Sequence, residues 1–348
     1  MPLKPAKFFI AMQIFVLWLC GCGQNGPEQH LDNYLQRLAN TLDANVPVIH
    51  QRSVPRLANR AQLRLDLPSA NLGALDFLAL RGCALQVTIG KRNSSLGRLA
   101  SDSQRLLLEL EYLQHAPKCI EQMRAEGRLE IVRTLTDAQT LKQQQLPGLI
   151  YNASLANVEF YRFWRKPAEL GPYPANTSSL VISAVGRLSG YIQRWLSGDY
   201  RADNRDFEIL LSEVAKGDGG ALLQSLALQE SRLAAGNTLL KRRLARGPLC
   251  APGYRAAAAD ILPVVIRKYF IGDVQPWSAA LGRRHYELLP VIERLEQQLN
   301  AALPETYTHW QNQRSQILSL MVEAPAAHVG QLKAALAPCQ TQQNTPGR

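Results

Sequence analysis

The chain has 348 residues and a formal net charge of +11, and 46% of its residues are hydrophobic against 19% charged. This balance excludes a disordered or low-complexity protein, and the length allows one large domain or two ordinary ones. Beyond the first hydrophobic stretch, no run approaches the roughly 18 uninterrupted apolar residues that a membrane-spanning helix needs. A polytopic membrane protein is therefore excluded as well.

The N-terminal segment has the features of a bacterial export signal. Two lysines, Lys4 and Lys7, precede an apolar run over residues 8–19, which is typical of a signal peptide. The run ends in Leu19-Cys20-Gly21-Cys22, which resembles the lipobox, in which a cysteine after a small residue receives a diacylglyceryl group. An uncleaved N-terminal anchor helix is the alternative interpretation.

The lipobox interpretation makes specific predictions for the mature protein. We expect residues 1–21 to be removed, Cys22 to be lipidated and residues 22–27 to form a short tether, which leaves a net charge of +9. An aspartate after the lipidated cysteine retains many such proteins in the inner membrane, whereas this chain has Gly23 there. We therefore expect a lipid anchor in the outer membrane of a Gram-negative bacterium, with the protein on the periplasmic face.

Four cysteines remain after the lipidation site, namely Cys83, Cys119, Cys250 and Cys339. An even number of cysteines in an oxidising compartment favours two disulfides, and the sequential pairing, Cys83 with Cys119 and Cys250 with Cys339, needs the shortest loops. No CxxC or HxxxH spacing occurs in the sequence, so we expect no metal site and no other cofactor.

The apolar periodicity is helical almost everywhere, which predicts an all-α protein. One helix follows a capping box at 101–104. Two further helices, at 288–303 and 307–321, are expected to form an antiparallel hairpin around the breaker Pro304. Only residues 61–67 alternate like a strand. The other predicted helices span residues 28–43, 71–90, 119–143, 149–165, 178–197, 204–216, 219–245 and 256–270.

The stretch from 166 to 177 contains three prolines and is the best position for a boundary. We therefore predict a multi-helix bundle of antiparallel helical hairpins in two packed halves. These halves are an N-terminal segment, 28–166, and a C-terminal segment, 178–340, each with one disulfide.

Three stretches of sequence from Cys83 to Cys119 carry a resemblance to a known family. They are Cys83-Ala84-Leu85-Gln86, Arg92-Asn93-Ser94-Ser95-Leu96-Gly97-Arg98, and Ser103-Gln104-Arg105-Leu106-Leu107 with Glu109-Leu110 and the closing Cys119. With the lipobox, this pattern is similar to a family of proteobacterial lipoproteins, domain of unknown function family 3080. The resemblance implies lipoprotein status, and it supplies no activity and no catalytic residue.

Two polar clusters are candidate contacts for an anion or a partner. In the first, Arg92 and Arg98 flank Asn93, Ser94 and Ser95, a composition that also makes a good turn between two helices.

The second cluster is the densest part of a basic stretch from Arg232 to Arg284, which has ten basic and two acidic residues. This cluster consists of Lys241, Arg242, Arg243 and Arg246. It lies at the end of a predicted helix, where cations also complement the helix dipole. An anionic envelope component, either phospholipid headgroups or cell-wall polymer, is the alternative partner. Nucleic acid is not expected for an exported protein.

No catalytic motif stands out in the sequence. Glu159 and Glu287 are acids beside aromatic residues and are the candidates for an enzyme acting on cell-wall glycan, although each is better explained as a carboxylate paired with an arginine. The leading hypothesis is therefore a non-catalytic binding or accessory protein of the cell envelope. The sequence does not identify its protein partner. A glycan-cleaving enzyme and a carrier of a lipid or other apolar ligand are the alternatives.

Overall fold

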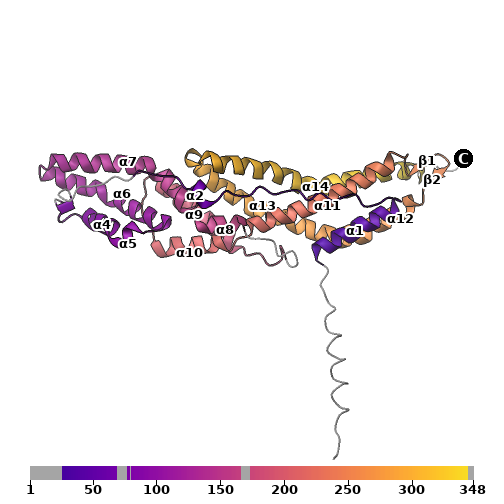
Figure 1. Cartoon of the computed structure of the whole chain (residues 1–348), viewed down its shortest axis with the longest axis horizontal. Coiled ribbons are helices and arrows are strands. Elements are labelled where there is room, and N and C mark those ends of the chain that lie inside the picture. The colour runs from indigo at the N-terminus through magenta and orange to yellow at the C-terminus, as the bar shows by residue number, and fades with distance from the viewer. Residues whose placement is uncertain (1–25, 69–76, 79, 166–172, 344–348) are drawn as a thin grey trace, which may run out of the picture.

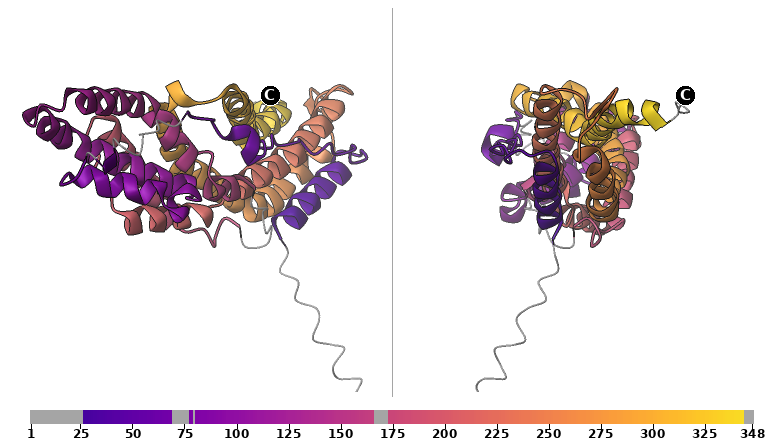
Figure 2. Two further views of the ribbon diagram at one scale, coloured as in Figure 1. Left: turned by 60° about the vertical axis from the view of Figure 1, so that its left-hand side comes forward. Right: turned by 90° about the vertical axis from the view of Figure 1, so that its right-hand side faces the viewer.

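The computed structural model describes residues 26–68, 77–78, 80–165 and 173–343, and it confirms an all-α bundle (Figure 1). The molecule is elongated, with α4 to α7 at one end and α1, α12 and a two-strand hairpin at the other (Figures 1 and 2). The elements are α1 (Pro27–Thr41), α2 (Arg60–Leu63), α4 (Ala84–Asn93), α5 (Ser95–Arg98), α6 (Asp102–Ala125), α7 (Leu129–Ala153), α8 (Val158–Arg165), α9 (Leu180–Leu196), α10 (Asn204–Ala215), α11 (Gly219–Leu244), β1 (Cys250–Ala251), β2 (Tyr254–Arg255), α12 (Ala258–Val265), the π-helix η2 (Ile266–Val274), α13 (Gln275–Gln298), the 3-10 helix η3 (Asn300–Ala302) and α14 (Glu305–Gln343).

Three groups of buried apolar side chains hold the helices together. The largest group occupies the centre and contains residues of the helices α6 through α11, of α13 and of the first half of α14. A second group joins α1 to α11, α12, η2 and the end of α14, and a third lies between α4, α6 and α7. The first helix in the described part of the chain therefore packs against C-terminal elements. The division of the chain into two halves, 28–166 and 178–340, stays a prediction made from the sequence.

Several predicted elements have different boundaries in the structure. The predicted helix 119–143 is two helices, because Gly127 adopts a φ of +72° in the turn between α6 and α7. The predicted helix 149–165 is likewise interrupted after α7, and Asn157 caps α8 by accepting the backbone N–H of Phe160 at 2.9 Å. The predicted helix 256–270 continues as the π-helix η2 to residue 274. Of the predicted helix 71–90, residues 71–76 and 79 lie outside the described residues, and α4 begins only at Ala84.

The predicted strand 61–67 is wrong. Residues 60–63 form the short helix α2, because Asn59 caps it by accepting the backbone N–H of Gln62 at 3.0 Å. Leu65 is extended, and its backbone N–H and C=O each bond at 2.9 Å to the side-chain amide of Asn152 on α7. An asparagine side chain thus provides the hydrogen bonds that a neighbouring strand would have provided.

The structure contains both predicted disulfides. Cys83, just before α4, is bonded to Cys119 on α6 with a Cα–Cα distance of 5.6 Å. Cys250 on β1 is bonded to Cys339 near the end of α14 with a Cα–Cα distance of 5.0 Å. The chain also turns at Pro304 as expected, but beyond the turn α14 lies along α11 rather than pairing closely with α13.

None of the described helices is both long and apolar enough to cross a membrane.

A buried histidine connects α1, α11 and α14. His328 has no exposed surface, and its Nδ1 lies 2.6 Å from Oδ1 of Asn237 while its Nε2 lies 2.6 Å from the hydroxyl of Tyr34. A neutral imidazole satisfies both contacts, with Nδ1–H donating to the amide oxygen and Nε2 accepting from the hydroxyl. Burial lowers the pKa of His328 to about 4 from an ordinary value of 6.5.

His328 should therefore make the protein less stable in mild acid. Between pH 6.5 and pH 4 the unfolded chain binds a proton that the folded chain rejects, so the free energy of unfolding decreases as the pH falls. The decrease due to His328 should total about 3 kcal/mol. Urea denaturation across this pH range should show a smaller slope for His328→Gln than for the unsubstituted protein. Equal slopes in the two proteins would contradict the prediction that His328 causes the loss of stability in mild acid.

A basic cleft as candidate functional site

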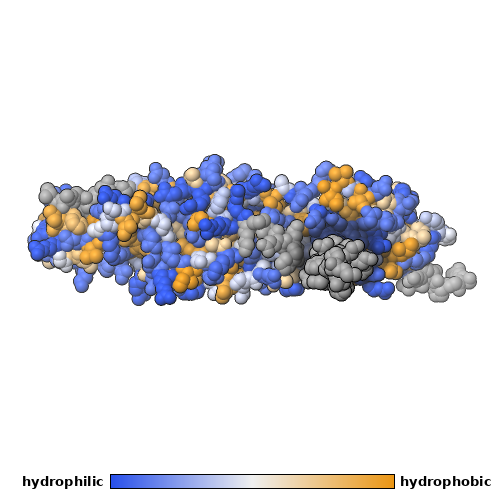
Figure 3. All heavy atoms as spheres, turned by 60° about the horizontal axis from the view of Figure 1, so that its bottom comes forward, coloured by the Kyte–Doolittle hydropathy of each residue, from blue (hydrophilic) through white to orange (hydrophobic). Residues whose placement is uncertain are grey.

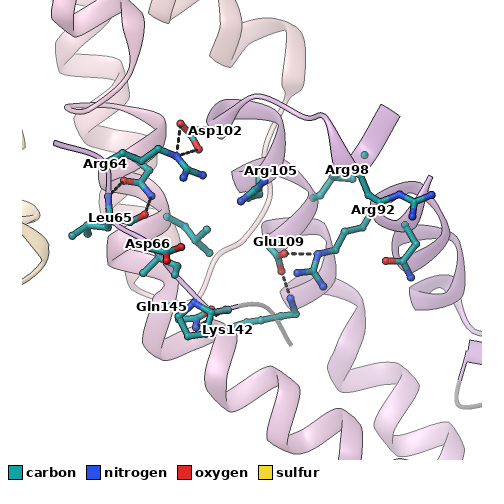
Figure 4. A pocket seen from close by; sticks show the side chains of 17 residues that line it. Arg64, Leu65, Asp66, Arg92, Arg98, Asp102, Arg105, Glu109, Lys142 and Gln145 are labelled. Carbon is teal, nitrogen blue, oxygen red and sulfur yellow. Dashed lines mark hydrogen bonds and ion pairs between the residues drawn. The ribbon is translucent and has the colours of Figure 1, made fainter. Parts of the chain in front are cut away.

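A cleft of about 480 Å³ opens between α4, α5, α6, α7 and the extended segment 64–68 (Figure 4). Its lining has five cationic and three acidic side chains, so the cleft is basic. The charged lining residues are Arg64, Asp66, Arg92, Arg98, Asp102, Arg105, Glu109 and Lys142.

The turn between α4 and α5 supplies one wall. Ser94 accepts the backbone N–H of Gly97 at 3.0 Å and donates to the backbone C=O of Lys91 at 2.7 Å, which closes the turn. Gly97 is required there, because a Cβ atom at this position would lie 2.1 Å from that same carbonyl oxygen. The turn interpretation of residues 93–97 is thereby supported, and the same turn brings Arg92 and Arg98 into the lining of the cleft.

Glu109 forms the floor of the cleft and holds two cations. It is 4% exposed, and its carboxylate pairs with Lys142 of α7 and, at 3.0 Å, with Arg92 of α4. Burial lowers the pKa of Lys142, an effect that Glu109 opposes and Arg92 reinforces. The ammonium group also lies 4.6 Å from the ring centroid of Tyr112, which adds a cation–π contact.

The rim of the cleft carries arginines with different partners. Nε of Arg64 lies 3.0 Å from Oδ1 of Asp102 at the start of α6. Arg98 and Arg105 have no ion pair with any residue in the described ranges. Figure 4 shows Arg64, Arg105 and Arg98 along one side of the cleft, with Glu109 and Lys142 on the other. Among the described residues, two guanidinium groups therefore line the cleft without an ion pair to a carboxylate.

This arrangement suits the binding of an anion. A guanidinium group offers a planar fork of donors that matches the oxygens of a phosphate or a carboxylate. The volume is in the range of sites for small molecules and is much larger than a single inorganic ion needs. Glu109 is an acceptor for two cations here, whereas a general acid needs a protonated carboxyl group.

The structure separates the other predicted site residues from the cleft. Glu159 lies on α8, and Glu287 lies on α13 with a side chain 59% exposed, 4.0 Å from Arg284. Neither lines the cleft, and Glu287 instead borders a separate pocket beside Trp277. Cys22 lies outside the described residues.

The second basic cluster is partly explained by helix capping. Arg243 donates to the C=O of Gly247 at 2.8 Å, beyond the end of α11, and Arg246 donates to the C=O of Leu42 at 2.7 Å, at the end of α1. Lys241 and Arg242 are exposed on the last turn of α11. Two of the four cations therefore stabilise helix ends, in agreement with the dipole interpretation.

Three cationic residues of the cleft were not predicted from the sequence: Arg64, Arg105 and Lys142. Arg64 and Lys142 are far from the turn in sequence. Lys142 reaches the cleft through the packing of α7 on α6, and Arg64 reaches it through its ion pair with Asp102. Arg105 and Glu109 were present in the string Ser103–Leu110 that carries the family resemblance. No cluster of three or more histidine, cysteine or carboxylate side chains able to hold a metal occurs in the part of the chain that the structure describes.

Fold and site together define an all-α protein with a basic cleft formed by α4 to α7. The sequence profile of a family described as "Protein of unknown function (DUF3080)" matches residues 31–342, so the chain belongs to that family. The matched range includes every residue of the cleft. A search of curated proteins and a search of solved structures found no match.

Proposed function

We propose that this protein is a lipid-anchored, periplasm-facing protein of the outer membrane that acts by binding, and that its basic cleft binds an anionic ligand. One observation carries the binding part of the proposal: Arg98 and Arg105 line a cleft of about 480 Å³ without an ion pair among the described residues. Uncompensated guanidinium groups in a concave site attract anions more strongly than cations on a flat surface do.

The lipobox at Cys22 supports the anchor. The first described helix begins at Pro27, only five residues after Cys22, so the folded protein would follow the lipid almost directly. Gly23 after the lipidated cysteine favours the outer membrane.

A binding role agrees better with the cleft than the two alternatives do. An enzyme acting on glycan would need a carboxylic acid placed to protonate the scissile bond, and the buried carboxylate of this cleft is paired with two cations. A carrier would need a mostly apolar interior, and eight charged residues line this site.

Titration calorimetry at low salt tests the binding proposal. The probes are inorganic phosphate and glycerol 3-phosphate, with galacturonate as a carboxylate without phosphorus. The double variant Arg98→Gln/Arg105→Gln should lose on the order of tenfold or more in affinity, because each bidentate contact to an anion contributes at least about 1.5 kcal/mol.

The matched control is Lys241→Gln/Arg242→Gln, which removes the same charge from exposed positions on α11. It should bind the probes like the unsubstituted protein. The proposal fails if the unsubstituted protein binds none of the three probes, or if the control loses as much affinity as the cleft variant.

A further inference from the structure

The short helix α5 and the residue that follows it each present one leucine to solvent. Leu96 is 85% exposed and Leu99 is 86% exposed, which makes them the most exposed large hydrophobic side chains among the residues that the structure describes. The turn holds them outward, because Ser94 caps the helix and Gly97 lies against the backbone of α4. Exposing this much apolar surface is unfavourable in water, which indicates that another surface covers it.

The surroundings of this tip are basic. Residues 91–101 contain Lys91, Arg92 and Arg98 and no acidic residue. Two glutamates of α6 pair with the first two of these cations, at 2.8 Å for Lys91 and 3.0 Å for Arg92, and Arg98 sits between the two leucines without an ion pair in the described structure. An apolar tip that carries one arginine without an ion pair among the described residues complements the surface of an anionic lipid leaflet.

The position of the tip agrees with such a contact. Helix α5 and the start of α1 both lie toward the lower long side of the molecule in Figure 1. Figure 3 faces this side and shows apolar side chains interspersed with hydrophilic ones at the end that holds α4 to α7. A lipid on Cys22 would hold Pro27 within about 17 Å of the leaflet, because five residues span no more than that. This step rests on the proposed anchor.

We propose that the α5 tip docks on an anionic phospholipid leaflet. Leu96 and Leu99 enter the boundary between headgroups and acyl chains, and Arg98 lies at the level of the lipid phosphates. This second contact keeps the elongated molecule lying along the membrane and holds the basic cleft next to the headgroups.

Cosedimentation with vesicles tests the contact without the anchor. The chain is prepared unacylated as residues 23–348, which retain every residue that the structure describes. It is mixed at low salt with vesicles of phosphatidylglycerol and phosphatidylcholine, or of phosphatidylcholine alone. We expect binding to the anionic vesicles, weakened by added salt, and a loss on the order of tenfold for Leu96→Ser/Leu99→Ser.

The matched control is Leu320→Ser, because Leu320 is 53% exposed on α14, away from α5. It should bind like the unsubstituted chain. The docking proposal is overturned if the unsubstituted chain binds no vesicles, or if the α5 variant and the control bind equally well. Incorporation of labelled palmitate into the full chain and into Cys22→Ser tests the anchor separately, so failure of the anchor and failure of the α5 contact are distinguishable.

Discussion

Replacing Arg314 by Met should lower the free energy of unfolding by about 3–5 kcal/mol, the usual cost of breaking a buried ion pair. Arg314 on α14 and Glu296 on α13 are both 0% exposed, and two hydrogen bonds of 2.7 and 2.8 Å join them. The guanidinium carbon lies 4.9 Å from the rings of both Trp164 and Trp310. Removing Arg314 leaves the carboxylate of Glu296 buried without a cation.

Two neutral donors remain around Glu296 in this variant. The hydroxyl of Tyr307 donates at 2.7 Å and the amide of Gln311 at 2.8 Å. These contacts hold the carboxylate in place, but they do not supply the charge that Arg314 supplied. Much of the loss in the free energy of unfolding of Arg314→Met should therefore be measurable by urea denaturation at neutral pH.

The double variant Glu296→Met/Arg314→Met separates charge from packing. Both charges are then absent and the side chains keep similar volumes, so the double variant should be more stable than Arg314→Met alone. The pair of Arg187 and Asp206, whose side chains are 53% and 27% exposed, is the matched control, and Arg187→Met should change stability far less than Arg314→Met does. Equal losses for Arg187→Met and Arg314→Met would show that the burial of the pair has no energetic consequence.

Helices with a local pattern and local end signals were predictable from the sequence. The predicted helices 178–197, 204–216 and 219–245 lie within two residues of α9, α10 and α11. The start of α10 is typical, because Asp203 accepts the backbone N–H of Asp206 at 2.7 Å and so fixes the first turn. These features need only neighbouring residues, and the sequence contains them all.

Features that depend on distant residues were not predictable in this way. The pairing of Glu296 with Arg314 and the contacts of His328 need the packed helices before any partner is defined. The alternation at 61–67 favoured a strand, but Asn59 caps a helix there and Asn152, on another helix, holds Leu65. For the same reason, only some of the residues that line the cleft could be predicted from the sequence. The turn gave Arg92 and Arg98, whereas Lys142 enters the site only through the packing of α7 on α6.

Replacing Glu109 by Gln should destabilise the protein by about 3–5 kcal/mol at neutral pH, because Glu109 is the carboxylate that compensates two cations at the floor of the cleft. Lys142 is 3% exposed and Glu109 is 4% exposed, so water screens their interaction weakly. Glu111→Gln is the matched control. Its partner Lys91 has a side chain 53% exposed, and the substitution should change stability by about 1 kcal/mol or less.

The pH dependence of Glu109→Gln identifies Lys142 as the cause of the loss. Burial already lowers the pKa of Lys142, and removing the opposing charge of Glu109 lowers it further. Between this lowered pKa and the ordinary 10.5, the unfolded chain binds a proton that the folded chain lacks, so the free energy of unfolding rises with pH. Urea denaturation from pH 7 to pH 10 should therefore show a steeper rise for Glu109→Gln than for Glu111→Gln.

Phosphate should partly rescue the Glu109→Gln variant if the cleft binds anions. A bound phosphate would supply negative charge near Arg92 and Lys142, and a ligand that binds only the folded state raises the free energy of unfolding. We expect phosphate to stabilise Glu109→Gln more than it stabilises Glu111→Gln, measured as the shift in melting temperature at constant ionic strength. Equal phosphate shifts in the two variants would show that the floor of the cleft does not attract anions. Equal pH slopes in the two variants would show that Glu109 is not the counterion of Lys142.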